Sequence, residues 1–183
     1  MFERYTERAR RVVFFARYES SKYGSPAIET EHLLLGLTRE DKALLKRFLP
    51  NVSGEEIRHA IEQRVTIREK TSTSIDLPLS PECKRILAYA NEEAEHLKHH
   101  HIGTEHLLLG TLREDKCLAA QLLVEYGLNL ATTRAQLAGS TEDSGKPSEP
   151  QVPLVDRCSV HALVERLPDS ALGLAHSMLE QLL

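Results

Sequence analysis

The sequence has no tryptophan, only 5% aromatic residues, and three cysteines among 183 residues. An odd number of widely spaced cysteines, Cys83, Cys117 and Cys158, suits neither a disulfide framework nor a zinc site. We expect reduced thiols that serve as small core residues. No apolar run approaches the roughly 20 residues that cross a bilayer, and the N-terminal stretch is charged where a signal peptide is apolar. These absences predict a soluble cytoplasmic protein without a membrane contact.

The motifs of common enzymes are also missing. The sequence has no Gly-x-Ser-x-Gly elbow, no His-Glu-x-x-His pair and no glycine-rich dinucleotide fingerprint. The nearest phosphate-loop lookalike, Gly145-Lys146, is followed by Pro147 where a Ser or Thr must bind magnesium. The net charge of -4 lacks the basic field that phosphate-backbone binding needs. We therefore predict a protein that is not an enzyme, uses no cofactor and does not bind nucleic acid.

The main positive feature of the sequence is an internal repeat. Residues 28–42, IETEHLLLGLTREDK, recur at 102–116 as IGTEHLLLGTLREDK, with twelve of fifteen positions identical at a constant offset of 74. The same offset aligns Thr6 with Ser80 and Glu19 with Glu93 without a gap. A duplication of this length predicts two like subdomains that pack together.

Apolar residues follow helical spacing in both copies, and no strand pattern competes with it. We expect Thr6 and Ser80 to cap the first helix of each copy, and Thr30 to cap a second, buried helix. The predicted fold class is all-α, with two pseudo-twofold-related four-helix repeats. In the first copy, the three helices after the Thr6-capped one are expected at 31–37, 42–49 and 53–65.

The chain divides into four predicted parts. Repeat one covers 1–70 and repeat two covers 75–138, while the Gly, Ser, Pro and acid-rich stretch 139–153 reads as a flexible linker. Residues 154–183 are expected to form a helical hairpin with one apolar side. A hairpin this small cannot bury that side alone, so it should dock on the main domain or form a homo-oligomer.

The repeated Ile-x-Thr-Glu-His-Leu-Leu-Leu-Gly segment and the opening FERYTERARRVV resemble one family. They are similar to the double Clp N-terminal repeat that precedes the ATPase rings of ClpA and ClpC type unfoldases, and the resemblance covers residues 2 to about 138. It implies a stand-alone, eight-helix, pseudo-twofold protein-binding domain without ATPase modules. The resemblance implies two kinds of partner, client or adaptor proteins and a Clp ATPase or protease. The domain would then regulate proteolysis by that Clp protease.

In ClpC-like members the resemblance further implies recognition of arginine-phosphorylated proteins. The Glu of each Thr-Glu-His segment would be a ligand, and these positions are Glu31 and Glu105 here. A carboxylate receives a guanidinium in a two-point fork, and the free amides at a helix start favour an anion. Hydroxyls for the phosphate would come from Thr30 and Thr104, or from Thr6 and Ser80 on neighbouring helix starts.

A simpler interpretation of the same residues stays open. Thr is a common N-cap, and Glu in a first turn complements the helix dipole by roughly 0.3 to 1 kcal/mol. The two copies also differ, because Glu29 stands where the second copy keeps the family's usual glycine as Gly103. A carboxylate there would crowd and repel a phosphate, so we rank the Glu105 site above the Glu31 site.

Histidines and charged turns offer two further candidates. His32 and His106 each stand alone at the start of a buried helix and are expected to be structural. His96 and His100 would share a helix face at i, i+4, but no carboxylate or cysteine completes a zinc set, so we predict no metal site. The cluster 39–42 and its copy at 113–116 are expected to form solvated turns.

One alternative function belongs to a different class. The chain would then be a structural or assembly factor that docks on a Clp ring, or self-associates, through residues 154–183 without touching clients.

Overall fold

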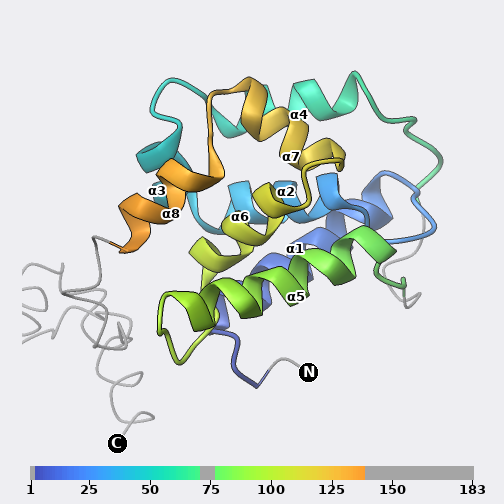
Figure 1. The fold of residues 1–183 in the computed structure, drawn as a ribbon. Helices are drawn as coiled ribbons and strands as arrows, with labels where there is room; N and C mark the ends of the chain where they lie inside the picture. The colour runs from blue at the N-terminus through green and yellow to red at the C-terminus, as the bar shows by residue number, and fades with distance from the viewer. Residues whose placement is uncertain (1–2, 71–76, 139–183) are drawn as a thin grey trace, which may run out of the picture. The chain divides into compact units, whose positions relative to one another are not determined.

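The computed structural model describes residues 3–70 and 77–138, and this part of the chain folds into helices only (Figure 1). The predicted all-α class and the four helices per copy are confirmed. The predicted linker at 139–153 and hairpin at 154–183 lie outside the described residues, and the division at 1–70 and 75–138 stays a prediction. The helices are α1 Glu7–Lys22, α2 Thr30–Glu40, α3 Lys42–Phe48, α4 Gly54–Glu62, α5 Pro81–His96, α6 Thr104–Arg113, α7 Leu118–Glu125 and α8 Leu130–Ala138.

The first helix of each copy begins as its sequence predicts. Thr6 Oγ1 accepts the backbone N–H of Ala9 at 3.2 Å, and Ser80 Oγ accepts that of Cys83 at 3.2 Å. Both caps have the same extended backbone, with φ -60° and ψ 158°. A side-chain acceptor satisfies one of the amides that a helix start leaves open. The duplication is therefore exact enough to preserve cap geometry.

The predicted Thr30 cap is wrong. Thr30 and Thr104 are the first residues inside α2 and α6, and the caps are Glu29 and Gly103. The histidine three residues after each cap closes the turn, because its Nδ1 accepts the cap's own backbone N–H. This bond measures 3.0 Å from Glu29 to His32 and 2.8 Å from Gly103 to His106. The sequence pattern missed this because an imidazole here replaces the usual Glu or Gln of a capping box.

The two copies exchange their leading segments. The backbone N–H of Thr6 donates to Ile102 O at 2.9 Å, and that of Ser80 donates to Ile28 O at 3.0 Å. Each bond is the other shifted by 74 residues, and two short bridges, Tyr5 with Ile102 and Ile28 with Leu79, repeat the relation. The start of each copy is thus held by the other copy, as the predicted pseudo-twofold arrangement requires.

The second helix of each copy lies at the centre of the described domain (Figure 1). The Leu-Leu-Leu runs of α2 and α6 are almost fully buried. Gly36 and Gly110 allow each helix to approach its neighbour, since a Cβ there would meet the carbonyls of Val12 and Ile86 and stand 3.0 Å from Ala16 N and Ala90 N. Glycine is needed here for close helix packing.

Each copy contains one buried carboxylate that is held by arginine side chains. Glu19 of α1 is 1% exposed and accepts two bonds from Arg58 of α4, at 2.9 and 3.0 Å. Glu93 of α5 is 0% exposed and accepts two bonds from Arg134 of α8, at 2.8 and 2.7 Å. Burial alone would raise the pKa of each carboxyl, but the arginine hydrogen bonds and charges outweigh it and lower both.

The charged clusters 39–42 and 113–116 are only partly the solvated turns that we predicted. Lys42, Asp115 and Lys116 are exposed, but the acidic residues before them are not. Glu40 and Asp41 side chains are only 10% and 6% exposed, and they pair with Arg11 at 2.7 Å and Arg8 at 3.1 Å respectively. In the second copy Glu114 is equally enclosed and pairs with Arg85 at 2.8 Å. The cluster therefore ties the second helix of each copy to the first.

Two helices end earlier than predicted. α4 stops at Glu62, so Val65 lies beyond it and is only partly buried. α5 stops at His96, and the chain then turns through Lys98, which has a φ of 57°. This left-handed residue takes the position that Gly24 has in the first copy.

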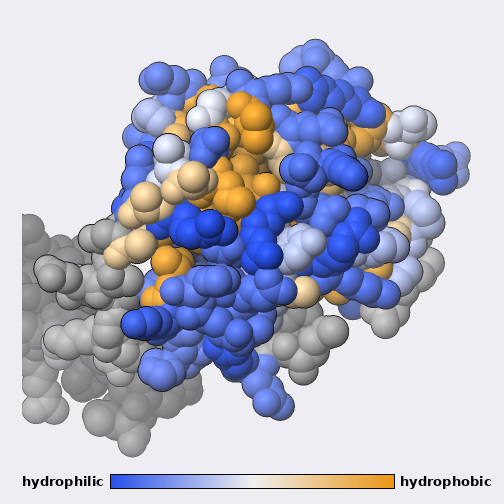
Figure 2. Space-filling model, in the orientation of Figure 1, coloured by the Kyte–Doolittle hydropathy of each residue, from blue (hydrophilic) through white to orange (hydrophobic). Residues whose placement is uncertain are grey.

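The surface of this domain is mostly hydrophilic on the side shown in Figure 2, where hydrophobic residues gather mainly around α7. Val124 of α7 is 58% exposed. None of the described helices is long and apolar enough to span a membrane.

Replacing Arg58 with methionine should destabilise the fold, because Glu19 would stay buried without its hydrogen-bonded partner. Only the weaker charge interactions with Lys22 and with Arg39, 3.7 Å away, would remain. Breaking a buried ion pair commonly costs 3–5 kcal/mol, and we expect about 3 kcal/mol because Arg58 is partly exposed. Denaturant-induced unfolding monitored by circular dichroism measures the change.

Arg64→Met is the matched control, since it removes the exposed pair of Arg64 with Glu125. We expect little change from it. If both variants lost the same free energy of unfolding, the buried pair of Glu19 with Arg58 would contribute no more to stability than an exposed pair, which would contradict the prediction.

Candidate functional site

The structure brings the predicted site residues together across the two copies. The backbone bond from Thr6 to Ile102 places Thr6 beside the segment that leads into α6, where Thr104 and Glu105 lie. The matching bond from Ser80 to Ile28 places Ser80 at the start of α2, beside Thr30 and Glu31. Each candidate site is therefore built from a helix start of one copy and a cap of the other.

Glu105 folds back over the start of its own helix. Its carboxylate lies against the Cα of Gly103, where a Cβ would collide with it, and is 3.2 Å from His106 Nδ1. That contact is not an ion pair, because Nδ1 already accepts the Gly103 N–H and burial lowers the pKa of His106. The carboxylate thus occupies the place where a helix start favours an anion.

Glu31 has a different environment. The pKa of its carboxyl is raised, first by burial and also by the charge of Glu29. Glu29 has a Cβ where the second copy has Gly103, so the space that receives the Glu105 carboxylate is narrower here. The candidate site of the first copy therefore has one more carboxylate and less space at the start of the helix than that of the second copy.

The four hydroxyls differ in what they offer a ligand. Those of Thr6 and Ser80 accept backbone N–H bonds in the cap and keep their own O–H to donate. Thr104 donates its O–H to Asp41 Oδ2 at 2.6 Å, which leaves it only acceptor capacity. Thr30 lies 3.3 Å from the Glu31 carboxylate. A phosphate needs donors, so Thr6 and Ser80 are the better placed pair.

The histidine cluster forms a hydrogen-bonded chain. His96 and His100 do not share a helix face, because α5 ends at His96, and that expectation is wrong. Instead His106 Nε2 lies 2.8 Å from His99 Nδ1, with the rings nearly perpendicular. The other nitrogen of His99, Nε2, is buried without a hydrogen-bond partner among the described residues.

His99, Glu105 and His106 are close enough to be considered as metal ligands. The hydrogen bonds argue against that role. His106 Nδ1 receives the Gly103 N–H, so its Nε2 carries the proton and points at His99. A metal needs ligand atoms with free lone pairs, and the lone pairs of both histidines already accept hydrogen bonds.

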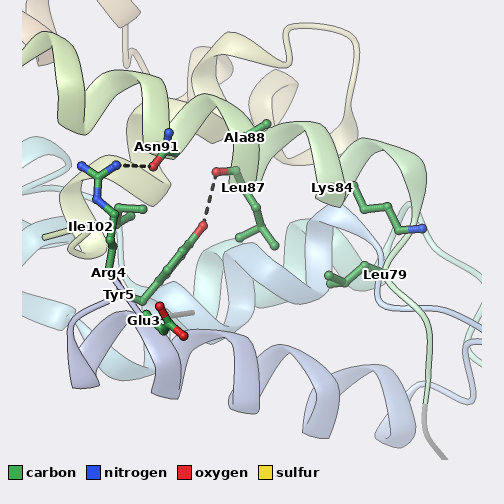
Figure 3. A pocket seen from close by; sticks show the side chains of 9 residues that line it. All are labelled: Glu3, Arg4, Tyr5, Leu79, Lys84, Leu87, Ala88, Asn91 and Ile102. Carbon is green, nitrogen blue, oxygen red and sulfur yellow. Dashed lines mark hydrogen bonds between the residues drawn. The ribbon is translucent and has the colours of Figure 1, made fainter. Parts of the chain in front are cut away.

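A cavity that the sequence did not indicate lies where the copies meet (Figure 3). It has a volume of about 450 Å³ and lies between the leading segment of the first copy and α5. The Tyr5 hydroxyl donates to Leu87 O at 3.3 Å across it, and Arg4 donates to Asn91 at 2.9 Å at its rim. Its apolar lining consists of Tyr5, Leu79, Leu87, Ala88 and Ile102.

The offset of 74 held one clue to this cavity, because it aligns Tyr5 with Leu79 and Ile28 with Ile102. Three of these four residues line the cavity. Only the folded backbone brings them to one place.

The cysteines are core residues where the structure describes them. Cys83 and Cys117 are buried and free, as predicted, and burial raises the pKa of Cys83 to about 12. Cys158 lies outside the described residues.

The fold and the paired helix starts define a class of protein, a tandem-repeat helical domain like those at the N-termini of Clp unfoldases. The family model of the Clp repeat (R) N-terminal domain matches residues 4–126, and the chain belongs to this family. Chaperone protein ClpB of Oceanobacillus iheyensis is 34% identical over 168 residues, covering 85% of this chain and 20% of that protein. The negative regulator of genetic competence ClpC/MecB of Bacillus subtilis is 34% identical over 165 residues, with the same coverage.

Solved structures agree with the family. The N-terminal domain of ClpD from Arabidopsis thaliana has 27% identity and a TM-score of 0.61, covering 74% of this chain and 92% of that one. The Hsp104 N-terminal domain from Candida albicans, at 20% identity and a TM-score of 0.61, shares the fold, covering 79% of this chain and 95% of that one. This chain spans about a fifth of the two curated relatives above, and the family match lies in an N-terminal domain rather than in an ATPase module.

The buried His32 should make the fold sensitive to acid. Burial lowers its pKa from 6.5 to about 4, so the folded protein binds fewer protons there than the unfolded chain does. The contribution of neutral His32 to the free energy of unfolding is fully present above pH 6.5. It falls as the pH drops towards 4, by up to about 1.4 kcal/mol per pH unit for one group. Thermal melts of wild type and His32→Gln across this range test this, and the variant should lose less stability on acidification.

A parallel pH dependence in both proteins would contradict this role for His32. His59→Gln, at an exposed position on α4, is the matched control and should behave as wild type.

Proposed function

We propose that this chain is a non-catalytic protein-binding module that captures clients or adaptors of a Clp ATPase or protease in the cytoplasm. The observation that carries the proposal is the backbone bond from Thr6 of one copy to Ile102 of the other, which brings the Thr6 cap next to the segment that leads into α6 and Glu105. This arrangement offers a carboxylate, a hydroxyl donor and helix-start amides to one ligand. Membership of the Clp N-terminal repeat family supports it.

We further propose that the ligand at this site is phosphoarginine on a client protein. Its guanidinium carries positive charge and two parallel donors, which a carboxylate such as Glu105 receives in a fork. Its phosphate suits the amides at the start of α6 and the Thr6 hydroxyl. Because Glu105 now lies over those amides, the ligand would displace it outward and then pair with it.

The cavity beside the site supports a protein ligand rather than a free small molecule. Its apolar walls are suited to a hydrophobic side chain, and Arg4 at its rim belongs to the same leading segment as Thr6. A client segment lying across both places would gain specificity from the phosphoarginine and contact area from the cavity.

The first copy should bind more weakly. Glu29 adds a negative charge and a Cβ at the start of α2, and the charge already raises the pKa of Glu31. A phosphate approaching there meets repulsion that Gly103 does not create in the second copy.

Calorimetric titration of free phosphoarginine tests both proposals. We expect saturable binding to the wild-type chain, lost mainly in Glu105→Ala and little changed in Glu31→Ala. Loss of the fork should weaken binding by about tenfold or more, as charge-assisted bonds contribute roughly 1.5–3 kcal/mol. Free arginine at the same concentration is the ligand control.

Glu29→Gly supplies the matched control in the protein, because it gives the first copy the residue of the second. It should add a second binding event. No heat at millimolar phosphoarginine would exclude this ligand and leave only the general protein-binding proposal.

A further inference from the structure

Among the exposed positions at which the first helices of the two copies differ, one has Tyr18 in α1 and Glu92 in α5. In the second copy, Glu92 pairs with Arg113 of α6 at 2.7 Å. The offset of 74 makes Arg39 of α2 the counterpart of Arg113, and Tyr18 stands where its carboxylate would be. The first copy therefore has the arginine of this pair without the acid.

Arg39 has no replacement for the missing carboxylate. Its one described ion-pair contact is to Glu19 at 3.7 Å, beyond hydrogen-bond distance. Glu19 is already engaged by Arg58 in two bonds. By contrast, Arg113 also donates to Glu93 at 3.2 Å. Of this matched pair, Arg39 is the guanidinium for which the described residues give no hydrogen bond.

Two aromatic rings hold Arg39 in place. Its guanidinium carbon lies 4.4 Å from the centroid of the Phe15 ring and 5.2 Å from that of Tyr18. Such cation–π contacts position the group without using its N–H donors. The side chain is 46% exposed, so a fork of donors faces solvent.

Two aromatic residues of this part of α1 lie outside the core, although Phe14 contacts Phe15 edge to face and Tyr18 contacts Arg39. Phe14 is 65% exposed and Tyr18 is 41% exposed. Their counterparts on α5 are Ala88 and Glu92, and that helix keeps the same cap and the same buried face. Since the same fold forms without rings at these positions, the exposed rings point to a contact beyond the described residues.

The charge of α1 indicates which contact. α1 carries five Arg or Lys and two Glu, and one of these, Glu19, is buried and paired. α5 carries two Arg or Lys and four Glu. Two of the α1 arginines, Arg8 and Arg11, pair with Asp41 and Glu40. The remaining side chains of α1 are still more basic than acidic on a chain of net charge -4, which favours an acidic partner.

We propose that Arg39, Phe14 and Tyr18 form a docking surface for an acidic segment of another protein. A Glu or Asp of the partner takes the place at Arg39 that Glu92 takes at Arg113, and a neighbouring apolar side chain covers Phe14. The surface lies at the end of α2 opposite to Glu31, on different residues from the phosphoarginine site, so either proposal can fail without the other.

Nuclear magnetic resonance of the full chain, with backbone and arginine side-chain signals, tests the surface. The probe is a capped pentapeptide of alternating leucine and glutamate, and its glutamine counterpart is the control. We expect saturable shifts at the Arg39 side chain and at the amides of residues 14–18, with the glutamine peptide about tenfold weaker. Arg113 should not respond, because Glu92 already occupies it.

Two variants graft the second copy onto the first. Tyr18→Glu supplies Arg39 with a carboxylate from the same chain and should lower the affinity for the peptide about tenfold. Phe14→Ala should lower this affinity as well. Both substitutions introduce the residue that the second copy tolerates, so unchanged thermal melts are expected. Val124→Ala, at an exposed apolar position on α7, is the control and should bind as wild type.

Four outcomes would overturn the proposal. The first is no saturable shift at Arg39 with millimolar peptide, and the second is equal binding by the glutamine peptide or by Tyr18→Glu. The third is the same response to inorganic phosphate, which would make Arg39 a general anion site. Shifts that appear at residues 14–18 on raising protein concentration alone would assign the surface to a second copy and overturn it too.

Discussion

The fold depends on placing one carboxylate per copy inside an apolar core and neutralising it there. Glu19 and Glu93 lie on the first helix of their copies, and the arginine that gives each of them two hydrogen bonds comes from the last helix of the same copy. Leaving a buried carboxylate unpaired costs a large free energy. α4 and α8 must therefore pack over the core in positions where Arg58 and Arg134 can bind Glu19 and Glu93. The central helices, with their glycine contacts, supply the packing beneath these clamps.

The sequence was sufficient for the helical class, the duplication and the caps at Thr6 and Ser80, because helical spacing and capping are local properties. It was insufficient where a partner is distant in the chain. Arg58 and Arg134 do not align at the offset of 74, so nothing marked them as equivalent partners of Glu19 and Glu93. The same limit hid the cavity, and it made the buried Glu40 and Asp41 look solvated.

For the candidate site, residue types were predicted and roles were partly misjudged. The backbone of Thr6 pairs with Ile102, just before the helix that carries Glu105. Thr104, however, is hydrogen-bonded to Asp41, and the side chain of His106 accepts the backbone N–H of the Gly103 cap. An imidazole acceptor in a capping position has no strong sequence signature. Duplication also leaves the copies free to differ, since either one can keep the packing residues while its exposed residues change. Glu29 against Gly103 and Tyr18 against Glu92 are differences of this kind.

The crossing of the leading segments has a practical consequence for any fusion protein. Residues 3–5 form one wall of the cavity and run beside the start of α6 (Figure 3). A purification tag or fluorescent protein joined ahead of them would leave the domain beside this cavity and beside the proposed ligand site. Such a tether would sit there at high effective concentration and act as a competitive inhibitor. Binding assays are therefore best made with labels attached elsewhere.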